Sequence, residues 1–187
     1  MPFSGEQIGE IDPAFSRRVG QMAGTSVVRC YQCMTCSLGC PVAFAIDDLP
    51  HQIVRMVQLG MAKRALSSST IWRCAACETC VARCPNGVDV LGVMDALREM
   101  ALTEKAEIGD PAVTAFNRTF LQNVRALGRQ YDLGLILLLK LKTRDLFSDL
   151  TLGIRMFLKG KLKLLPHKIE DSKGIKAIFQ KATGSQP

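Results

Sequence analysis

Two runs of cysteines with identical spacing constrain this chain more than any other feature of its sequence. The first run is Cys30-x-x-Cys33-x-x-Cys36-x-x-x-Cys40-Pro41, and the second is Cys74-x-x-Cys77-x-x-Cys80-x-x-x-Cys84-Pro85. All eight cysteines of the 187 residues lie in these two runs. The fold must therefore present two equivalent loops, each of them rich in thiols.

The spacing is that of bacterial ferredoxins, in which such runs hold [4Fe–4S] clusters. Three thiolates spaced three residues apart let a short loop wrap around one face of a cubane. The fourth cysteine is one residue further on, before proline, and in two-cluster ferredoxins it binds the other cluster. We therefore expect two [4Fe–4S] clusters, one on Cys30, Cys33, Cys36 and Cys84, and a second on Cys74, Cys77, Cys80 and Cys40.

Two other uses of cysteine fit the pattern less well. A zinc site takes four ligands, often as two Cys-x-x-Cys pairs, which would leave the third and fourth cysteines of each run without a role. A disulfide framework suits small secreted chains, and residues 1–6 show no basic region followed by an apolar run. The longest apolar run, over 133–139, falls short of the ~18 residues that a membrane span needs. We therefore expect a cytoplasmic protein without a transmembrane segment.

The segments around the cysteines have helical patterns, which predict an all-α fold. In the 33 residues between the two runs, apolar side chains recur at helical spacing over 49–66. Start signals precede this helix at Asp47, Asp48 and Pro50, and the polar residues 67–70 end it. Further helices are expected from Asp12-Pro13 to residue 22 and, capped by Asp89 after an Asn-Gly turn, over 90–101. Near the cysteine runs, only residues 26–28 resemble a strand.

The charge is divided unevenly between two regions. Residues 1–110 carry 10 basic and 12 acidic side chains, a net charge of −2, whereas residues 111–187 carry 14 and 5, a net charge of +9. In the second region, the spacing of apolar side chains predicts helices over 113–127 and 146–158. Between them lies an apolar segment over 133–141 that is either buried or covered by another chain. We expect a cluster domain over 1–110 and a helical docking extension over 111–187.

The basic tail over 159–168 interleaves lysine with leucine. Besides a protein partner, such a tail could bind a membrane surface as a helix, or a nucleic acid. No nucleic-acid-binding motif accompanies the charge, so we expect no nucleic acid.

The sequence offers no catalytic site of its own. Its two histidines, His51 and His167, lie far apart without a recognisable triad, and we expect His51 to be a surface or capping residue. No Gly-x-Gly-x-x-Gly motif opens a nucleotide-binding unit, so neither flavin nor NAD is expected in this chain. Several apolar residues near the cysteines are expected to shield the clusters or to pack in the core: Met34, Leu38, Val42, Ile71, Trp72 and Val81.

Two complete cubane motifs separated by a helical insert resemble the α-helical ferredoxins. Within that group the chain is most similar to the C subunit of heterodisulfide reductase. The likeness rests on its size, on two segments at the cysteine runs and on two near the C-terminus: Cys30-Tyr31-Gln32-Cys33, Trp72-Arg73-Cys74, Gly160-Lys161-Leu162 and Leu165-Pro166.

This resemblance implies an electron-transfer subunit of an oxidoreductase complex. In that family, the C subunit passes electrons from the flavin-containing A subunit to the disulfide-reducing B subunit. The complex commonly works with hydrogenase or formate dehydrogenase through flavin-based electron bifurcation. The alternative is an iron–sulfur relay subunit of a membrane-associated respiratory oxidoreductase, linked to a quinone or haem. A freely diffusing ferredoxin is disfavoured, because it has little use for a basic, apolar extension.

Overall fold

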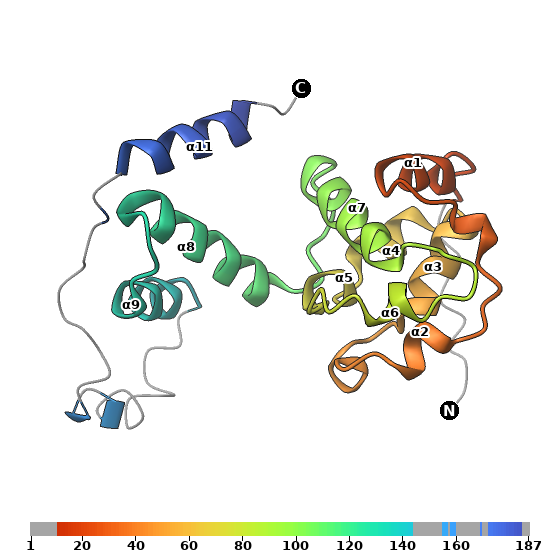
Figure 1. Ribbon diagram of the computed structural model, residues 1–187, viewed down its shortest axis with the longest axis horizontal. Coiled ribbons are helices and arrows are strands. Elements are labelled where there is room, and N and C mark those ends of the chain that lie inside the picture. The colour runs from red at the N-terminus through yellow and green to blue at the C-terminus, as the bar shows by residue number, and fades with distance from the viewer. Residues whose placement is uncertain (1–10, 144–154, 157, 160–168, 170–171, 185–187) are drawn as a thin grey trace. The chain divides into compact units, whose positions relative to one another are not determined.

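The computed structural model describes residues 11–143, 155–156, 158–159, 169 and 172–184. The chain forms two compact units, Met1–Pro111 and Ala112–Pro187. All regular elements of the described residues are helical and none is a strand (Figure 1), which confirms the all-α prediction. The helix predicted over 146–158 and the tail over 159–168 lie almost entirely outside the described residues.

The first unit contains α1 Phe15–Met22, η1 Val27–Arg29, α2 Thr35–Leu38, η2 Ala43–Ala45, α3 Pro50–Gln58, α4 Ala62–Ser67, α5 Thr70–Arg73, α6 Thr79–Ala82 and α7 Val90–Thr103. The second unit contains α8 Pro111–Leu127, whose first residue is the last of the first unit, α9 Asp132–Thr143 and α11 Ser172–Gly184.

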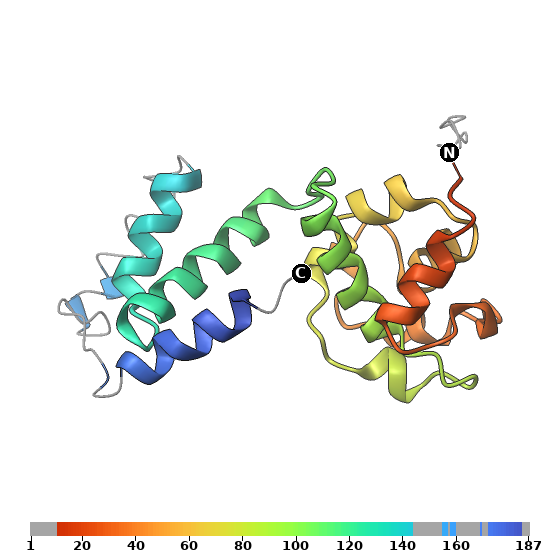
Figure 2. The ribbon, with the colours of Figure 1, turned by 90° about the horizontal axis from the view of Figure 1, so that it is seen from above.

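The core of the first unit forms around α7, which contacts α1, α3, α4, α5 and α6. Figure 2 shows α1 and α7 lying side by side. Aliphatic side chains of α3 and α7 are fully buried in this core, together with Phe15 and Val19 of α1. Their burial stabilises the unit by about 1.5–3 kcal/mol for each large side chain. The cysteine loops are thus attached to a packed helical scaffold.

The long helix predicted over 49–66 is two helices, α3 and α4. The chain turns at Gly60, whose φ of +72° is a conformation that favours glycine. A Cβ atom at Gly60 would also lie 2.4 Å from the carbonyl oxygen of Asp12, so the position has no room for a side chain. The amide of Asp12 donates to the Gly60 carbonyl at 2.9 Å, so this turn fastens the segment before α1 to the insert.

The Asp89 cap is confirmed, because the Asp89 carboxylate accepts a hydrogen bond of 2.7 Å from the amide of Gly92. The strand-like assignment of residues 26–28 is wrong. These residues form the 3₁₀ turn η1, in which the Arg29 amide donates to the Ser26 carbonyl at 3.2 Å. The side-chain amide of Gln58 donates to the Val27 carbonyl at 2.9 Å and to the Cys30 carbonyl at 3.2 Å, so a helix side chain takes the place of a partner strand.

The second unit buries polar side chains on α8 and leaves apolar ones partly exposed. Thr114, Thr119 and Asn123 are buried, whereas Phe116 and Phe120 are 40% and 37% exposed. The two phenylalanine rings stack on each other with their centroids 6.3 Å apart. Two apolar side chains of α9, Ile136 and Leu138, are likewise exposed. The described part of α8 therefore has no apolar side chain among its buried residues.

Candidate functional site

The two cysteine loops have the same local structure. Each contains two residues with positive φ: Gln32 at 62° and Met34 at 65° in the first loop, and Ala76 at 51° and Glu78 at 59° in the second. A non-glycine residue with positive φ is uncommon, and four at equivalent positions show that both loops curl in the same way. A one-turn helix follows each loop, α2 in the first and α6 in the second, and these two helices contact each other.

Each loop closes one side of a cavity, and the other run completes it. Site 1 is lined by Cys30, Cys33 and Cys36 of the first run and by Cys84 of the second. Site 2 is lined by Cys74, Cys77 and Cys80 of the second run and by Cys40 of the first. The empty volumes are nearly equal, about 350 Å³ for site 1 and about 360 Å³ for site 2. Each cavity is lined by four thiols, the number of cysteine ligands that one [4Fe–4S] cluster takes.

The four thiols of each cavity do not gather around one point. Within the described part of the chain, no three His, Cys, Asp or Glu side chains gather closely enough to hold one ion. The sulfurs surround a volume instead. A larger open depression lies along α1 and η1, but no cysteine lines it, so it takes no part in binding a cluster.

Each loop pairs an exposed thiol with a less accessible one. Cys33 and Cys77 are exposed, and their pKa values are lowered by the hydroxyls of Thr35 and Thr79, which lie 3.3 and 3.4 Å from the respective sulfurs. Burial raises the pKa of Cys80 to about 11, and the neighbouring Cys74 thiol adds to the rise. Burial also raises the pKa of Cys36. Iron binds thiolates, so its binding releases the protons that these two thiols retain.

His51 does not lie free on the surface. It is half-buried, it lines site 1, and burial lowers its pKa. The His51 amide donates to the Ser37 hydroxyl oxygen at 3.1 Å, and the same oxygen lies 2.7 Å from His51 Nδ1. Ser37 is on α2, next to Cys36. His51 therefore joins the start of α3 to the helix that carries the third cysteine.

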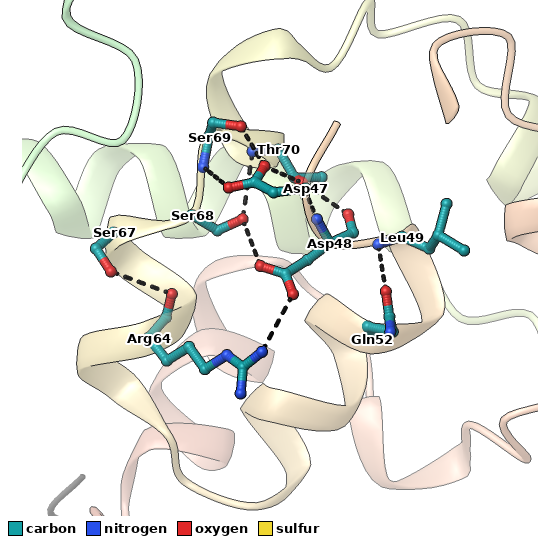
Figure 3. A network of polar contacts seen from close by, with 9 residues as sticks. All are labelled: Asp47, Asp48, Leu49, Gln52, Arg64, Ser67, Ser68, Ser69 and Thr70. Carbon is teal, nitrogen blue, oxygen red and sulfur yellow. Dashed lines mark hydrogen bonds and ion pairs between the residues drawn. The ribbon is translucent and has the colours of Figure 1, made fainter. Parts of the chain in front are cut away.

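A polar network fastens the segment after the first run to the segment before the second (Figure 3). The carboxylate of Asp47 accepts hydrogen bonds from the Ser69 hydroxyl and, at 3.2 Å, from the Ser69 amide. The Asp48 carboxylate accepts from the Ser68 hydroxyl at 3.0 Å and pairs with Arg64 at 3.6 Å. Burial by itself raises the pKa of Asp47, but the hydrogen bonds from Ser69 and Thr70 outweigh it, so the pKa lies below its ordinary value.

Further contacts hold the second run in place. Arg73, which precedes Cys74, donates to the Asp110 carboxylate and to the Ala45 carbonyl, each at 2.7 Å. The side-chain amide of Asn86 donates to the Arg29 carbonyl at 2.5 Å, beside Cys30. The bonds to Ala45 and to Arg29 link the two runs, so the cavities are built from segments far apart in the sequence.

The residues expected to shield the clusters fall into two groups. Ile71 and Trp72 are buried, whereas Met34 and Leu38 are exposed. Val42 is half-buried and lines site 2, and Val81 is half-buried. The threonines beside Cys33 and Cys77 were not singled out from the sequence, although the shared pattern Cys-x-Thr-Cys in both runs marks them.

The comparisons with known proteins point to the same cofactor. Residues 29–88 match the model of the 4Fe-4S dicluster domain. The chain is 33% identical over 93 residues to the C subunit of the H(2):CoB-CoM heterodisulfide,ferredoxin reductase of Methanothermobacter marburgensis, a match that covers 50% of each chain. It is 38% identical over 76 residues to the iron-sulfur C subunit of the CoB–CoM heterodisulfide reductase of Methanopyrus kandleri, covering 41% of this chain and 40% of that one. The cysteine-bearing part of the chain is thus similar to the C subunits of these two heterodisulfide reductases.

A third relative of the same kind extends the likeness. The C subunit of the ferredoxin:CoB-CoM heterodisulfide reductase of Methanosarcina acetivorans is 40% identical over 76 residues, which are 41% of this chain and 30% of that protein. The chain spans about half the length, or less, of the curated relatives it matches. The dicluster domain and the eight cysteines establish two [4Fe–4S] clusters as its cofactors. No helix among the described residues has the length and apolar character needed to span a membrane.

Proposed function

We propose that this chain passes electrons through two [4Fe–4S] clusters, from a flavin-containing subunit to a disulfide-reducing subunit of a heterodisulfide reductase-type complex. The observation that carries the proposal is the pair of adjacent four-cysteine cavities in a chain related to the C subunit of that enzyme. When bound, the clusters supply one-electron chemistry. The chain supplies the thiolates, the hydrogen bonds to them and the fixed separation between the two sites.

The ligand sets follow the crossed pattern. Cys30, Cys33, Cys36 and Cys84 bind the cluster of site 1, and Cys40, Cys74, Cys77 and Cys80 bind the cluster of site 2. The lining of the two cavities supports this assignment, because each contains three cysteines of one run and the fourth of the other. The contact between α2 and α6 supports it too, since it brings the two runs together.

The region after residue 110 is the docking extension of this relay. Its charge of +9 suits an acidic partner surface. Its apolar side chains support the same assignment, because Phe116, Phe120 and Leu121 of α8 are exposed while its buried side chains are polar. Covering apolar surface is favourable by about 25 cal/mol per Å², so a partner that covers these side chains gains affinity from them.

Anaerobic mixing with purified partners tests the relay. The reduced chain is mixed with the disulfide-reducing subunit of a heterodisulfide reductase and with a heterodisulfide, and loss of the reduced-cluster signal is followed by absorbance. We expect rapid reoxidation that requires both the disulfide and its reductase. In gel filtration we expect a stable complex with the flavin-containing partner and with the disulfide-reducing partner. Omission of the disulfide serves as the control.

Two results would contradict the proposal. The first is the absence of binding to either partner while both clusters are intact. The second is co-purification from the native cell with a membrane-bound quinone or haem subunit instead. Salt-sensitive binding to vesicles of anionic lipid would point to the same respiratory alternative.

A further inference from the structure

The two cluster loops are a natural internal comparison, because their backbones match and their side chains differ. Gln32 of the first loop corresponds to Ala76 of the second, and both have positive φ. The threonines correspond as well, and each lies beside the second cysteine of its run. Whatever differs between the loops therefore comes from side-chain chemistry and from the segment that carries the fourth cysteine.

Site 1 has two hydrogen-bond donors that have no counterpart among the described residues of site 2. The side-chain amide of Gln32 donates to Cys30 Sγ at 3.4 Å. The backbone amide of Val88 donates to Cys84 Sγ at 3.3 Å. Both groups are neutral donors directed at cluster-ligating sulfurs, and a thiolate that accepts a hydrogen bond donates less charge to its iron.

Site 2 presents a poorer set of donors. Ala76 has no polar side-chain atom to offer Cys74, and among the described residues only Thr79 forms a side-chain hydrogen bond with a sulfur of this site. The hydrogen bond from the Val88 amide to Cys84 Sγ has no equivalent at Cys40 Sγ among the described residues. The backbone amides that follow Cys77 and Cys80 have equivalents after the second and third cysteines of the first run, so they do not distinguish the sites.

Other polar groups near the sites do not reverse this difference. The Ser37 hydroxyl lies 3.9 Å from Cys36 Sγ but only 2.7 Å from His51 Nδ1, so it interacts mainly with the histidine. Glu78 lines site 2, and the Arg83 side chain rests on the Gly39 backbone beside Cys40. These two charges have opposite signs and are both exposed, so solvent screens their effect on the cluster.

We infer that the cluster held at site 1 has the higher reduction potential of the two, and that Gln32 is a residue that sets the difference. Hydrogen bonds to the ligating sulfurs are among the factors that set the potential of an iron–sulfur cluster. By withdrawing charge from the sulfurs, they favour the reduced form. The first electron added to the chain is therefore kept at site 1. The inference rests on the proposed ligand sets, and it gives the relay a downhill direction from site 2 to site 1.

The test exchanges the corresponding residues of the two loops in the intact chain. Three forms are reconstituted anaerobically: the natural chain, Gln32→Ala and Ala76→Gln. Iron content is measured first, and each form is then titrated with dithionite in the presence of redox mediators while both clusters are followed by EPR. We expect two midpoint potentials in the natural chain. Gln32→Ala lowers the higher midpoint and leaves the lower one in place, whereas Ala76→Gln raises the lower midpoint.

Several outcomes would overturn the inference. The inference is wrong if Gln32→Ala shifts the lower midpoint potential, or if this variant keeps both clusters and shifts neither midpoint. It is also wrong if the natural chain titrates with a single midpoint. If Gln32→Ala fails to retain its clusters, the test rests on Ala76→Gln. A rise of the higher midpoint potential in Ala76→Gln then contradicts the assignment. These potentials are measured without partners, so a relay that fails to bind its partners leaves the result unaffected. A chain that holds no clusters would refute both proposals.

Discussion

Replacement of Thr70 by valine tests whether the network of Figure 3 holds the two cysteine runs together. Thr70 begins α5, four residues before Cys74, and its side chain is 1% exposed. Its hydroxyl donates to the Asp48 carbonyl at 2.7 Å and accepts from the Asp48 amide at 3.1 Å, and it makes a longer contact of 3.2 Å with the Asp47 carboxylate, which competes for the same proton. Valine has nearly the same shape but cannot form either bond.

The magnitude follows from these two bonds. Each is worth about 1 kcal/mol net, and loss of the hydroxyl leaves two backbone groups of Asp48 without this partner, so we expect a loss of about 2 kcal/mol. For a unit of this size the loss lowers the melting temperature by about 8 °C. Thr70→Ser keeps the hydroxyl and loses one buried methyl group, which is worth about 0.8 kcal/mol or about 3 °C.

The assay is anaerobic thermal unfolding of the iron-loaded chain, followed by far-UV circular dichroism at one fixed scan rate. A fixed rate is needed because loss of the clusters makes unfolding irreversible. Asp95→Ala is the control, since Asp95 is an exposed residue whose ion pair with Arg98 on α7 contributes little to stability. If hydrophobic burial governs the stability at this position instead, the melting temperature of Thr70→Val equals or exceeds that of Thr70→Ser. That order would disprove the proposed role of the hydroxyl.

Three further predictions concern the clusters and the extension. Anaerobically reconstituted protein binds about eight irons and shows a broad absorbance near ~400 nm that dithionite bleaches; a colourless protein that binds zinc tightly would contradict this. Cys40→Ser damages the cluster of site 2 and Cys84→Ser that of site 1, whereas spectroscopy that joins Cys40 to the cluster of Cys30 would rule out the crossed ligation. Deletion of residues 111–187 leaves iron content unchanged and abolishes binding to the disulfide-reducing partner; loss of both clusters would place the extension within the cluster fold.

Sequence patterns predicted the local features of this chain well, because those features depend on neighbouring residues. The all-α class followed from helical spacing of apolar side chains, and the Asp89 cap from the preference of aspartate for that position. The cofactors followed from cysteine spacing, since a loop of that length fits a cubane. The crossed ligation stays a prediction, supported by the lining of the two cavities.

The errors arose where distant segments decide the local structure. A helical pattern over 49–66 continues through Gly60, but the chain turns there because its backbone packs against Asp12. The valines of residues 26–28 favour a strand, yet Gln58 satisfies the neighbouring carbonyls and a 3₁₀ turn results. His51 has no special sequence context, and only the approach of α2 to α3 brings it to Ser37.

The sequence by itself determined which cofactor the chain binds, because cluster chemistry requires thiolates at a fixed spacing along a short loop. Only the tertiary structure decided how the two loops are held, and which donors reach each set of sulfurs. Asp47 and Asp48 have the pattern of helix-start signals, and residues 67–70 have the pattern of a helix end. In the fold the two aspartates accept hydrogen bonds from Ser68 and Ser69 of that second segment. Such hydrogen bonds depend on the packing of helices far apart in the sequence, so a local sequence pattern cannot predict them.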